Sequence, residues 1–446
     1  MRTLLGLGVA VLCACGGTPG PTGGGAAGGS ASAGGAASAG GAASAGGSAS
    51  AGGSASAGGS ASAGGSASAG GSASPSDGGS SPWAFFPVSG TKCASGAPAG
   101  IGYNSGVTDE LVIFVQGGGA CWNNGMCRPS VYQWGPVCNY GMDSVCLVDI
   151  PGATQPTAVY VAHPDPFPGD GGGAFATEVA TVMNSVLFSR RAENPFAAAS
   201  WAFVPYCTGD LHAGNTTRTY NTKGGLFDPV VPRTHHFAGA TNMDAYLAWL
   251  RARHASVRTL WLIGVSGGGY GAQLNLHRVK QAFPEAQVQL LADSAPMVNT
   301  PYFDAVRREW NLQVPSSCTT CDAGFPAIIE NQIVNAPTSR VALLSFSEDQ
   351  VITRFFFAPG TTAGWATPPT SSYVAALAAL EPIYEAHSNS KFFRRPGQEH
   401  VMLDNAGIVR PDGGITPSIS STDGGITLKA WIDAWATGMG TWESQR

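Results

Sequence analysis

Two patterns of hydrophobic residues alternate along the chain from residue 111 onward. Short continuous apolar runs are typical of strands buried on both faces of a sheet. Longer stretches with apolar residues every three or four positions are typical of helices with one buried face. Strands are expected at Leu111–Val115, Trp201–Tyr206, Thr259–Ile263, Val288–Ala292, Arg340–Phe346 and Lys391–Phe393. Helices are expected at Asn242–Arg253, Gly269–Phe283 and Tyr373–Ala386.

This alternation predicts an α/β fold. Strands that alternate with helices form a mainly parallel sheet flanked by helices on both faces. Ligand sites in such sheets lie beyond the carboxyl ends of the strands. The segment 135–173 is rich in Pro, Gly and Asp, and we expect it to form disulfide-tied loops near that edge.

Composition divides the chain into three parts. Residues 16–82 are almost entirely Gly, Ala and Ser, so they offer no side chain that can build a core, and we interpret them as a disordered linker. The folded domain is expected at 83–446. Residues 1–15 read as a secretory signal, because Arg2 precedes the apolar run Leu4–Leu12.

The end of that signal, Leu12-Cys13-Ala14-Cys15, resembles a bacterial lipobox, in which Cys15 would carry a lipid anchor. An ordinary secretory signal is the alternative. Either way we expect an extracytoplasmic protein, held on the cell envelope as a lipoprotein or secreted. The linker would then join an anchor to the folded domain.

Charge and hydropathy limit the kinds of partner that the chain is expected to bind. The formal net charge is −5 and only 11% of residues are charged, which argues against a nucleic-acid-binding surface. No apolar run of spanning length follows the N-terminus, so membrane contact is expected only through the anchor. We expect a monomer.

Eight of the 10 cysteines lie in the region 83–446. An even number in an exported chain suggests disulfides. Local spacing favours the pairs Cys121–Cys127, Cys138–Cys146 and Cys318–Cys321, which leaves Cys93–Cys207. The Cys318-x-x-Cys321 motif fits a redox pair or half of a zinc site as well, but no second ligand pair lies nearby in sequence, so no metal is expected.

A candidate nucleophile lies between a predicted strand and a predicted helix. Residues 264–268 read Gly-Val-Ser-Gly-Gly and match G-x-S-x-G, the turn that exposes a catalytic serine in α/β-hydrolase-like folds. Ser266 would then lie near a helix N-terminus, where a developing anion is favoured.

A dinucleotide fingerprint overlaps the same turn. Gly267-x-Gly269-x-x-Ala272 fits that fingerprint, and Asp293 follows about 20 residues later. This interpretation is disfavoured because the motif lies late in the domain and the other parts of a hydrolase occur in order. We therefore expect no cofactor.

The candidate oxyanion hole lies after the first predicted strand. A tetrahedral intermediate needs two preorganised backbone N–H groups at its negatively charged oxygen. The stretch Gln-Gly-Gly-Gly-Ala-Cys at 116–121 is similar to the HGGG element of esterases. We expect Gly118, Gly119 and Gly267 to donate these N–H groups; a purely structural turn is the alternative.

The general base is expected among the histidines that follow Ser266, because the order in this fold is Ser, acid, His. Three of the eight histidines follow it, and the first of them, His277, lies on the predicted helix Gly269–Phe283, which leaves His387 and His400. His387 lies at the end of a predicted helix, where a structural role is expected. His400 lies in a loop after the last predicted strand and is the expected base.

The acid should follow a strand between these two residues. Asp349 follows the predicted strand that ends at Phe346 and is our choice. Glu348 is the neighbour that could take the role instead. Asp293, after an earlier strand, is the weaker alternative.

Four ordered motifs resemble the pectin acetylesterase family over most of residues 92–404. They are Cys-Ala-Ser-Gly-Ala-Pro at 93–98, the glycine stretch at 116–121, Tyr-Cys-Thr-Gly-Asp at 206–210 and the serine turn at 264–268. The resemblance implies a serine esterase with the triad Ser266, Asp349 and His400. Members remove acetyl groups from pectin or a longer acyl chain from a protein, so the implied substrate is an acylated carbohydrate or another ester.

Some positions depart from the family pattern. Gln116 and Ala120 stand where the family has Glu and Trp, and Gln350 directly follows Asp349 instead of standing three residues after it. His212 is expected either to line the pocket or to be structural. A non-catalytic module that binds surface polysaccharide is the alternative function.

Overall fold

The computed structural model describes the folded domain in several stretches. They are residues 83–94, 96, 98–124, 126–127, 190, 192, 194–223, 229–357, 370–403, 408–409, 415–416, 422–423 and 426–446. The predicted signal, the predicted lipid anchor at Cys15, the predicted linker and the predicted Cys138–Cys146 pair lie outside these residues.

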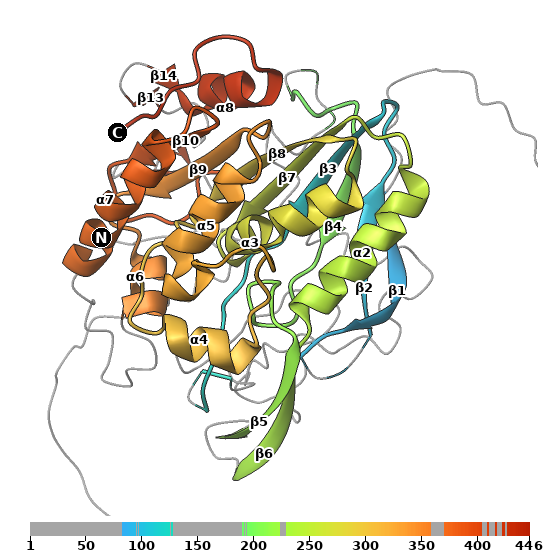
Figure 1. The fold of residues 1–446 in the computed structure, drawn as a ribbon, viewed down its shortest axis with the longest axis vertical. Coiled ribbons are helices and arrows are strands. Elements are labelled where there is room, and N and C mark those ends of the chain that lie inside the picture. The colour runs from blue at the N-terminus through green and yellow to red at the C-terminus, as the bar shows by residue number, and fades with distance from the viewer. Residues whose placement is uncertain are drawn as a thin grey trace, which may run out of the picture. The chain divides into compact units, whose positions relative to one another are not determined.

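An eight-stranded sheet runs through the domain in the order β1-β2-β4-β3-β7-β8-β9-β10 (Figure 1). The strands are β1 (Ala84–Lys92), β2 (Pro98–Asn104), β3 (Glu110–Val115), β4 (Ser200–Val204), β7 (Thr259–Val265), β8 (Gln287–Asp293), β9 (Val341–Phe346) and β10 (Ser390–Arg395). From β4 to β10 all neighbours are parallel, which confirms the predicted mainly parallel sheet. The sequence analysis did not predict β1 and β2, which extend one edge in antiparallel fashion.

Helices and small strand pairs surround this sheet. The helices are α2 (Gly239–Arg253), α3 (Gly267–Ala282), α4 (Phe303–Trp310), α5 (Phe325–Val334), α6 (Gln350–Phe357), α7 (Thr370–Glu385) and α8 (Leu428–Thr437). The strand pairs are β5 (Thr216–Lys223) with β6 (Val230–Phe237), β11 (Ile408–Val409) with β12 (Ile415–Thr416), and β13 (Thr422–Asp423) with β14 (Ile426–Thr427). Among the described helices, none has the length and apolar composition needed to span a bilayer.

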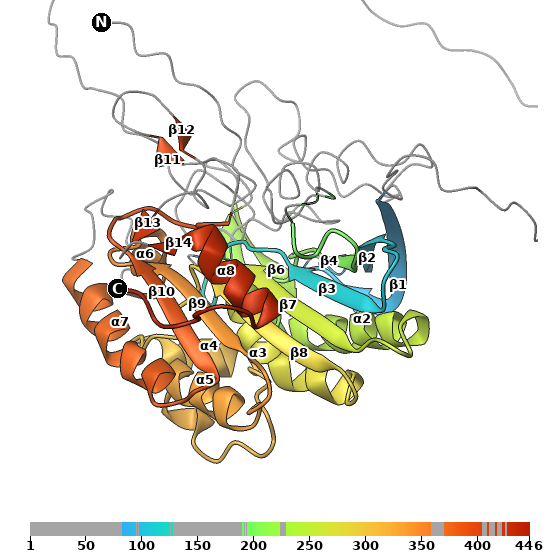
Figure 2. The same ribbon diagram turned by 90° about the horizontal axis from the view of Figure 1, so that it is seen from above.

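Two hydrophobic cores form on the two faces of the sheet, because successive strand residues point to opposite sides. In β3, Leu111 and Ile113 belong to the core that also contains Leu274 of α3. Val112 belongs to the core that contains Trp431 of α8. Figure 2 shows α8 on the opposite side of the sheet from α2 and α3.

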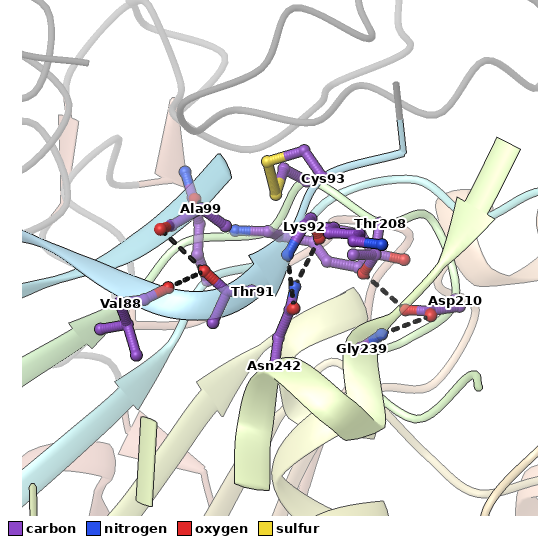
Figure 3. Close-up of a disulfide and its surroundings, with 12 residues drawn as sticks. Val88, Thr91, Lys92, Cys93, Ala99, Thr208, Asp210, Gly239 and Asn242 are labelled. Carbon is purple, nitrogen blue, oxygen red and sulfur yellow. Dashed lines mark hydrogen bonds between the residues drawn. A yellow bond between two sulfur atoms is a disulfide. The ribbon is translucent and has the colours of Figure 1, made fainter. Parts of the chain in front are cut away.

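The antiparallel edge is attached to the parallel part by a disulfide and by side-chain hydrogen bonds (Figure 3). Cys93, after β1, is bonded to Cys207, after β4. Asn242 of α2 accepts the Lys92 N–H at 2.8 Å and donates to the Lys92 carbonyl at 2.7 Å. Disulfides Cys121–Cys127 and Cys318–Cys321 are also present, so three of the four expected pairs are found in the described residues.

Candidate active site

Ser266 lies in the turn between β7 and α3 with φ 51° and ψ −127°. A non-glycine residue rarely adopts a positive φ, and the strain is typical of a functional turn. The turn has no room for side chains on either flank. A Cβ at Gly264 would lie 2.2 Å from the Gly268 oxygen, and one at Gly268 would lie 2.0 Å from the Val115 oxygen. Backbone crowding therefore explains the glycines of the G-x-S-x-G motif.

The glycine loop after β3 lies directly against the start of α3. A Cβ at Gly267 would lie 2.4 Å from the Gly118 oxygen and 3.2 Å from the Gly118 nitrogen. Cys121, at the far end of the loop, donates its N–H to the Gly209 carbonyl at 3.0 Å. The loop is thus held where Gly118 lies close to the residue after the serine.

His212 is buried against this loop. Its Nε2 lies 2.9 Å from the Gln116 carbonyl oxygen, and its ring lies 4.5 Å from the ring of Tyr206. Burial lowers its pKa to about 4, so the ring is neutral and donates Nε2–H to that carbonyl. Of the two expected roles, the geometry fits the structural one.

Asp349 and His400 form a direct hydrogen-bonded pair, with Oδ2 2.7 Å from Nδ1. The Asp349 side chain is fully buried and the His400 side chain is 9% exposed. The second oxygen, Oδ1, accepts the N–H groups of Val351 at 2.9 Å and Ile352 at 3.0 Å, at the start of α6. The helix start therefore fixes the carboxylate that faces the imidazole.

Two neighbouring loops bring this pair together, because β9 and β10 are adjacent parallel strands. Ser347 donates its N–H to the Arg395 carbonyl at 2.8 Å, and Glu348 donates its N–H to the Gly397 carbonyl at 2.9 Å. The Glu348 carboxylate accepts a hydrogen bond from Gln398 at 2.9 Å. Asp349, and not its neighbour, thus contacts the histidine.

Asp293 connects the serine turn to the histidine loop. Its backbone carbonyl accepts the Ser266 N–H at 2.8 Å, and its Oδ2 accepts the N–H groups of Met402 and Leu403, each at 2.7 Å. Burial raises its pKa to about 7, while these hydrogen bonds and the nearby His400 act in the opposite direction. A carboxylate engaged in this way is not placed as the acid of a triad.

The other candidate histidine lies elsewhere. His387 follows α7, and its carbonyl accepts the Ser390 N–H at the amino end of β10. Ser266 follows the carboxyl end of β7, which is parallel to β10 through the intervening strands. His387 is therefore at the opposite edge of the sheet from the serine turn.

One group of potential metal ligands occurs among the described residues: Cys121, Cys127 and His235. The two sulfurs are joined in a disulfide, so they are not thiolates, the form that binds zinc. His235 instead places Nε2 3.0 Å from the Thr208 carbonyl oxygen. In this group, therefore, the two cysteines crosslink the chain and the histidine contacts backbone.

Parts of this chain are similar to known esterases. Residues 173–311, which contain Ser266, match the family model described as Pectinacetylesterase. A 157-residue segment is 27% identical to the palmitoleoyl-protein carboxylesterase NOTUM of Mus musculus. That segment is 30% of this chain and 29% of the relative, so the chain spans less than a third of the curated relative that it matches.

The fold also has a solved counterpart. The crystal structure of the Wnt deacylase Notum from Drosophila is similar with a TM-score of 0.50 and 16% sequence identity. The match covers 80% of this chain and 94% of that structure. The predicted α/β-hydrolase-like fold is confirmed.

Proposed function

We propose, from the match of residues 173–311 to the Pectinacetylesterase family model, that this chain is a serine carboxylic-ester hydrolase that deacetylates an acylated polysaccharide. The observation that carries the proposal is the 2.7 Å contact between Asp349 and His400, connected through Asp293 to the strained turn of Ser266. A buried carboxylate on Nδ1 leaves Nε2 as the ring nitrogen that accepts a proton.

The reaction would proceed in two halves. Ser266 Oγ attacks the ester carbonyl carbon while His400 Nε2 takes its proton. The N–H groups of Gly118, Gly119 and Gly267 donate to the oxyanion. The intermediate then collapses, and the alcohol leaves with the proton from His400. Water, deprotonated by the same imidazole, hydrolyses the acyl-enzyme and restores the serine.

Asp349 would keep the imidazole in the required tautomer and stabilise the imidazolium. The arrangement suits this role because both carboxylate oxygens are engaged: one accepts from the imidazole and the other from the start of α6. No residue in this scheme requires a metal or an organic cofactor.

The choice of an acetyl group rests on the family match, whose model is named for pectin acetyl ester cleavage. The matched relatives are named for a palmitoleoyl group on a protein and for Wnt deacylation, so a longer acyl chain on a protein is the competing substrate. The dinucleotide alternative loses support, since the carboxylate of Asp293 is buried and bonded to backbone N–H groups instead of being open to a ribose.

Hydrolysis assays test the proposal. We would measure 4-nitrophenyl esters from acetate to palmitate, and acetate release from acetylated pectin and xylan. We expect highest kcat/KM on acetyl esters and loss of activity in Ser266→Ala. Ser339→Ala is a matched control, because Ser339 is a buried serine that precedes β9 at the opposite edge of the sheet.

Three outcomes of this assay are distinct. Equal activity in wild type and Ser266→Ala would reject the serine mechanism. Binding of polysaccharide without hydrolysis would favour the non-catalytic module. Preference for palmitate would keep the esterase and replace the acetyl group by a long acyl chain.

We further propose that the protein works as a monomer outside the cytoplasm, attached through a lipid on Cys15. The disulfides support the compartment, because such bonds persist in oxidising environments. Metabolic labelling with a palmitate analogue tests the anchor. Labelling that persists in Cys15→Ser would contradict it, and size-exclusion chromatography of the folded domain tests the monomer.

A further inference from the structure

We propose that Asp293 and Ser294 are positioning residues that hold the His400 segment at a fixed place relative to Ser266. The inference rests on the proposed function, which gives His400 its role. It concerns two side chains outside the triad, neither of which takes part in a step of the proposed reaction.

The segment after His400 has a backbone conformation that needs support. Val401 has φ 66°, and a β-branched residue in this region is a clear outlier that surrounding contacts must maintain. Its N–H donates to Ser294 Oγ at 2.8 Å. The next two N–H groups, of Met402 and Leu403, both donate to Asp293 Oδ2 at 2.7 Å. Three consecutive backbone donors are therefore bound by this pair of side chains.

The same pair is fixed to the serine side of the site. The Asp293 carbonyl accepts the Ser266 N–H at 2.8 Å, and Ser294 donates its N–H to the Leu344 carbonyl of β9 at 2.8 Å. Ser294 Oγ donates to Asp293 Oδ1 at 3.1 Å, which orients both side chains. A shift of either residue would change the separation between Ser266 and the histidine segment.

Asp349 does not perform this function. It contacts the imidazole ring and sets its rotation and tautomer, whereas Asp293 and Ser294 contact the backbone that follows His400. Both Asp293 and Ser294 are fully buried, where hydrogen bonds to a carboxylate are stronger than at the surface. Ring orientation and ring location therefore depend on different residues.

Substitutions can distinguish a role in placing His400, which would change kcat, from a role in the stability of the fold alone. Asp293→Ala removes the acceptor for two N–H groups, and we expect kcat to fall about 10²-fold with KM unchanged, as for a misplaced reacting group. Asp293→Asn keeps one carbonyl oxygen for these donors and should restore most of the loss. Ser294→Ala removes only the Val401 acceptor and should lower kcat about 10-fold.

Asn389→Ala is the matched control, because the Asn389 side chain also hydrogen-bonds distant backbone, as a donor to carbonyl groups at the opposite edge of the sheet. Its Nδ2 donates to the carbonyls of Ala336 at 2.9 Å and Ile333 at 3.2 Å. We expect a lower melting temperature and an unchanged kcat. An unchanged kcat in both Asp293→Ala and Ser294→Ala would overturn the proposal.

A second readout does not require ester hydrolysis. The proton between His400 Nδ1 and Asp349 should give a downfield resonance in the wild type, and displacement of the His400 segment should shift or remove it. We expect its loss in Asp293→Ala and its retention in Asn389→Ala. If Asp293→Ala does not fold, Ser294→Ala serves for both readouts.

The two proposals can fail separately. A wild type that shows the resonance and hydrolyses no ester would reject the esterase function. In that case loss of the resonance in Asp293→Ala would still support the positioning role. Persistence of an unshifted resonance in the folded variants would overturn it.

Discussion

Ser266, Ser294 and Val401 share a positive φ, with values of 51°, 51° and 66°. They follow the carboxyl ends of β7, β8 and β10, where the serine turn and the histidine segment meet. Each such residue costs on the order of 1–3 kcal/mol, so the surrounding contacts must maintain it. Half of the six described non-glycine residues with positive φ therefore lie where the proposed chemistry needs fixed placement.

Asp349→Asn is expected to lower kcat about 10⁴-fold, because an amide facing the imidazole favours the wrong tautomer. The asparagine can still cap α6 through its Oδ1, so the melting temperature should change little. Steady-state kinetics on 4-nitrophenyl acetate and thermal denaturation check both parts. Glu348→Gln is the control and should keep wild-type kcat, since Glu348 contacts Gln398. Full activity in Asp349→Asn would exclude Asp349 as the acid.

Gly267→Ala is expected to lower kcat at least about 10²-fold, the effect of losing one oxyanion donor. The new Cβ would lie 2.4 Å from the Gly118 oxygen and would push the glycine loop away from α3. Gly90→Ala is the control: Gly90 has φ +85° and no atom within 4 Å of its Cβ position, so only stability should fall. Similar kinetics for the two variants would contradict the placement of the loop.

At the scale of elements, the site depends on how adjacent strands deliver their loops. β9 and β10 pair in register from Val341 with Ser390 to Phe346 with Arg395, so their loops leave the sheet side by side. On the serine side, the loop after β4 accepts the Cys121 N–H of the glycine loop at the Gly209 carbonyl, and His235 of β6 contacts the same loop at the Thr208 carbonyl. Because a buried histidine such as this one is neutral in the folded protein, its packing makes the free energy of unfolding depend on pH.

In His235→Gln, the free energy of unfolding is expected to fall less than in the wild type as the pH is lowered from 6.5 to 4. Burial lowers the His235 pKa from 6.5 to about 4, so between these values the unfolded chain binds more protons than the folded one. The stability that neutral His235 contributes is present above pH 6.5 and is lost as pH falls towards 4. The advantage of wild type over the variant should shrink by on the order of 3 kcal/mol across this window.

Chemical denaturation at pH 7, 5.5 and 4 measures this difference. His236→Gln is the neighbouring control and should show a smaller change, because His236 is much less buried. A constant difference between wild type and His235→Gln over this range would show that His235 does not titrate with folding.

At the scale of the whole molecule, the Cys93–Cys207 disulfide joins parts of the chain that are 114 residues apart. Closure of so long a loop restricts the unfolded chain, and its removal should cost about 5 kcal/mol. We expect the double variant Cys93→Ala, Cys207→Ala to unfold at a much lower denaturant midpoint. The pair Cys318–Cys321 spans three residues, and its double alanine variant should lose only about 2 kcal/mol. Equal losses would indicate that loop length is not the cause.

Much of this architecture could be predicted because it depends on local pattern. Apolar runs located the parallel strands, and the crowded turn around Ser266 left a recognisable glycine motif. Each predicted element is present with shifted ends; α3 begins two residues early because Gly267 and Gly268 already belong to its first turn. The antiparallel strands β1 and β2, of 9 and 7 residues, lack a continuous apolar run and went unpredicted.

By itself, the sequence determined the alternation of strands and helices and the order of the candidate groups, since both follow from neighbours along the chain. Only the tertiary structure decided that Asp349, and neither Glu348 nor Asp293, contacts His400. The reason is physical: adjacent carboxylates differ in direction, and that direction depends on hydrogen bonds from segments distant in sequence. The contacts of Asp293 with the backbone after His400, 109 and 110 residues away, leave no trace in local pattern.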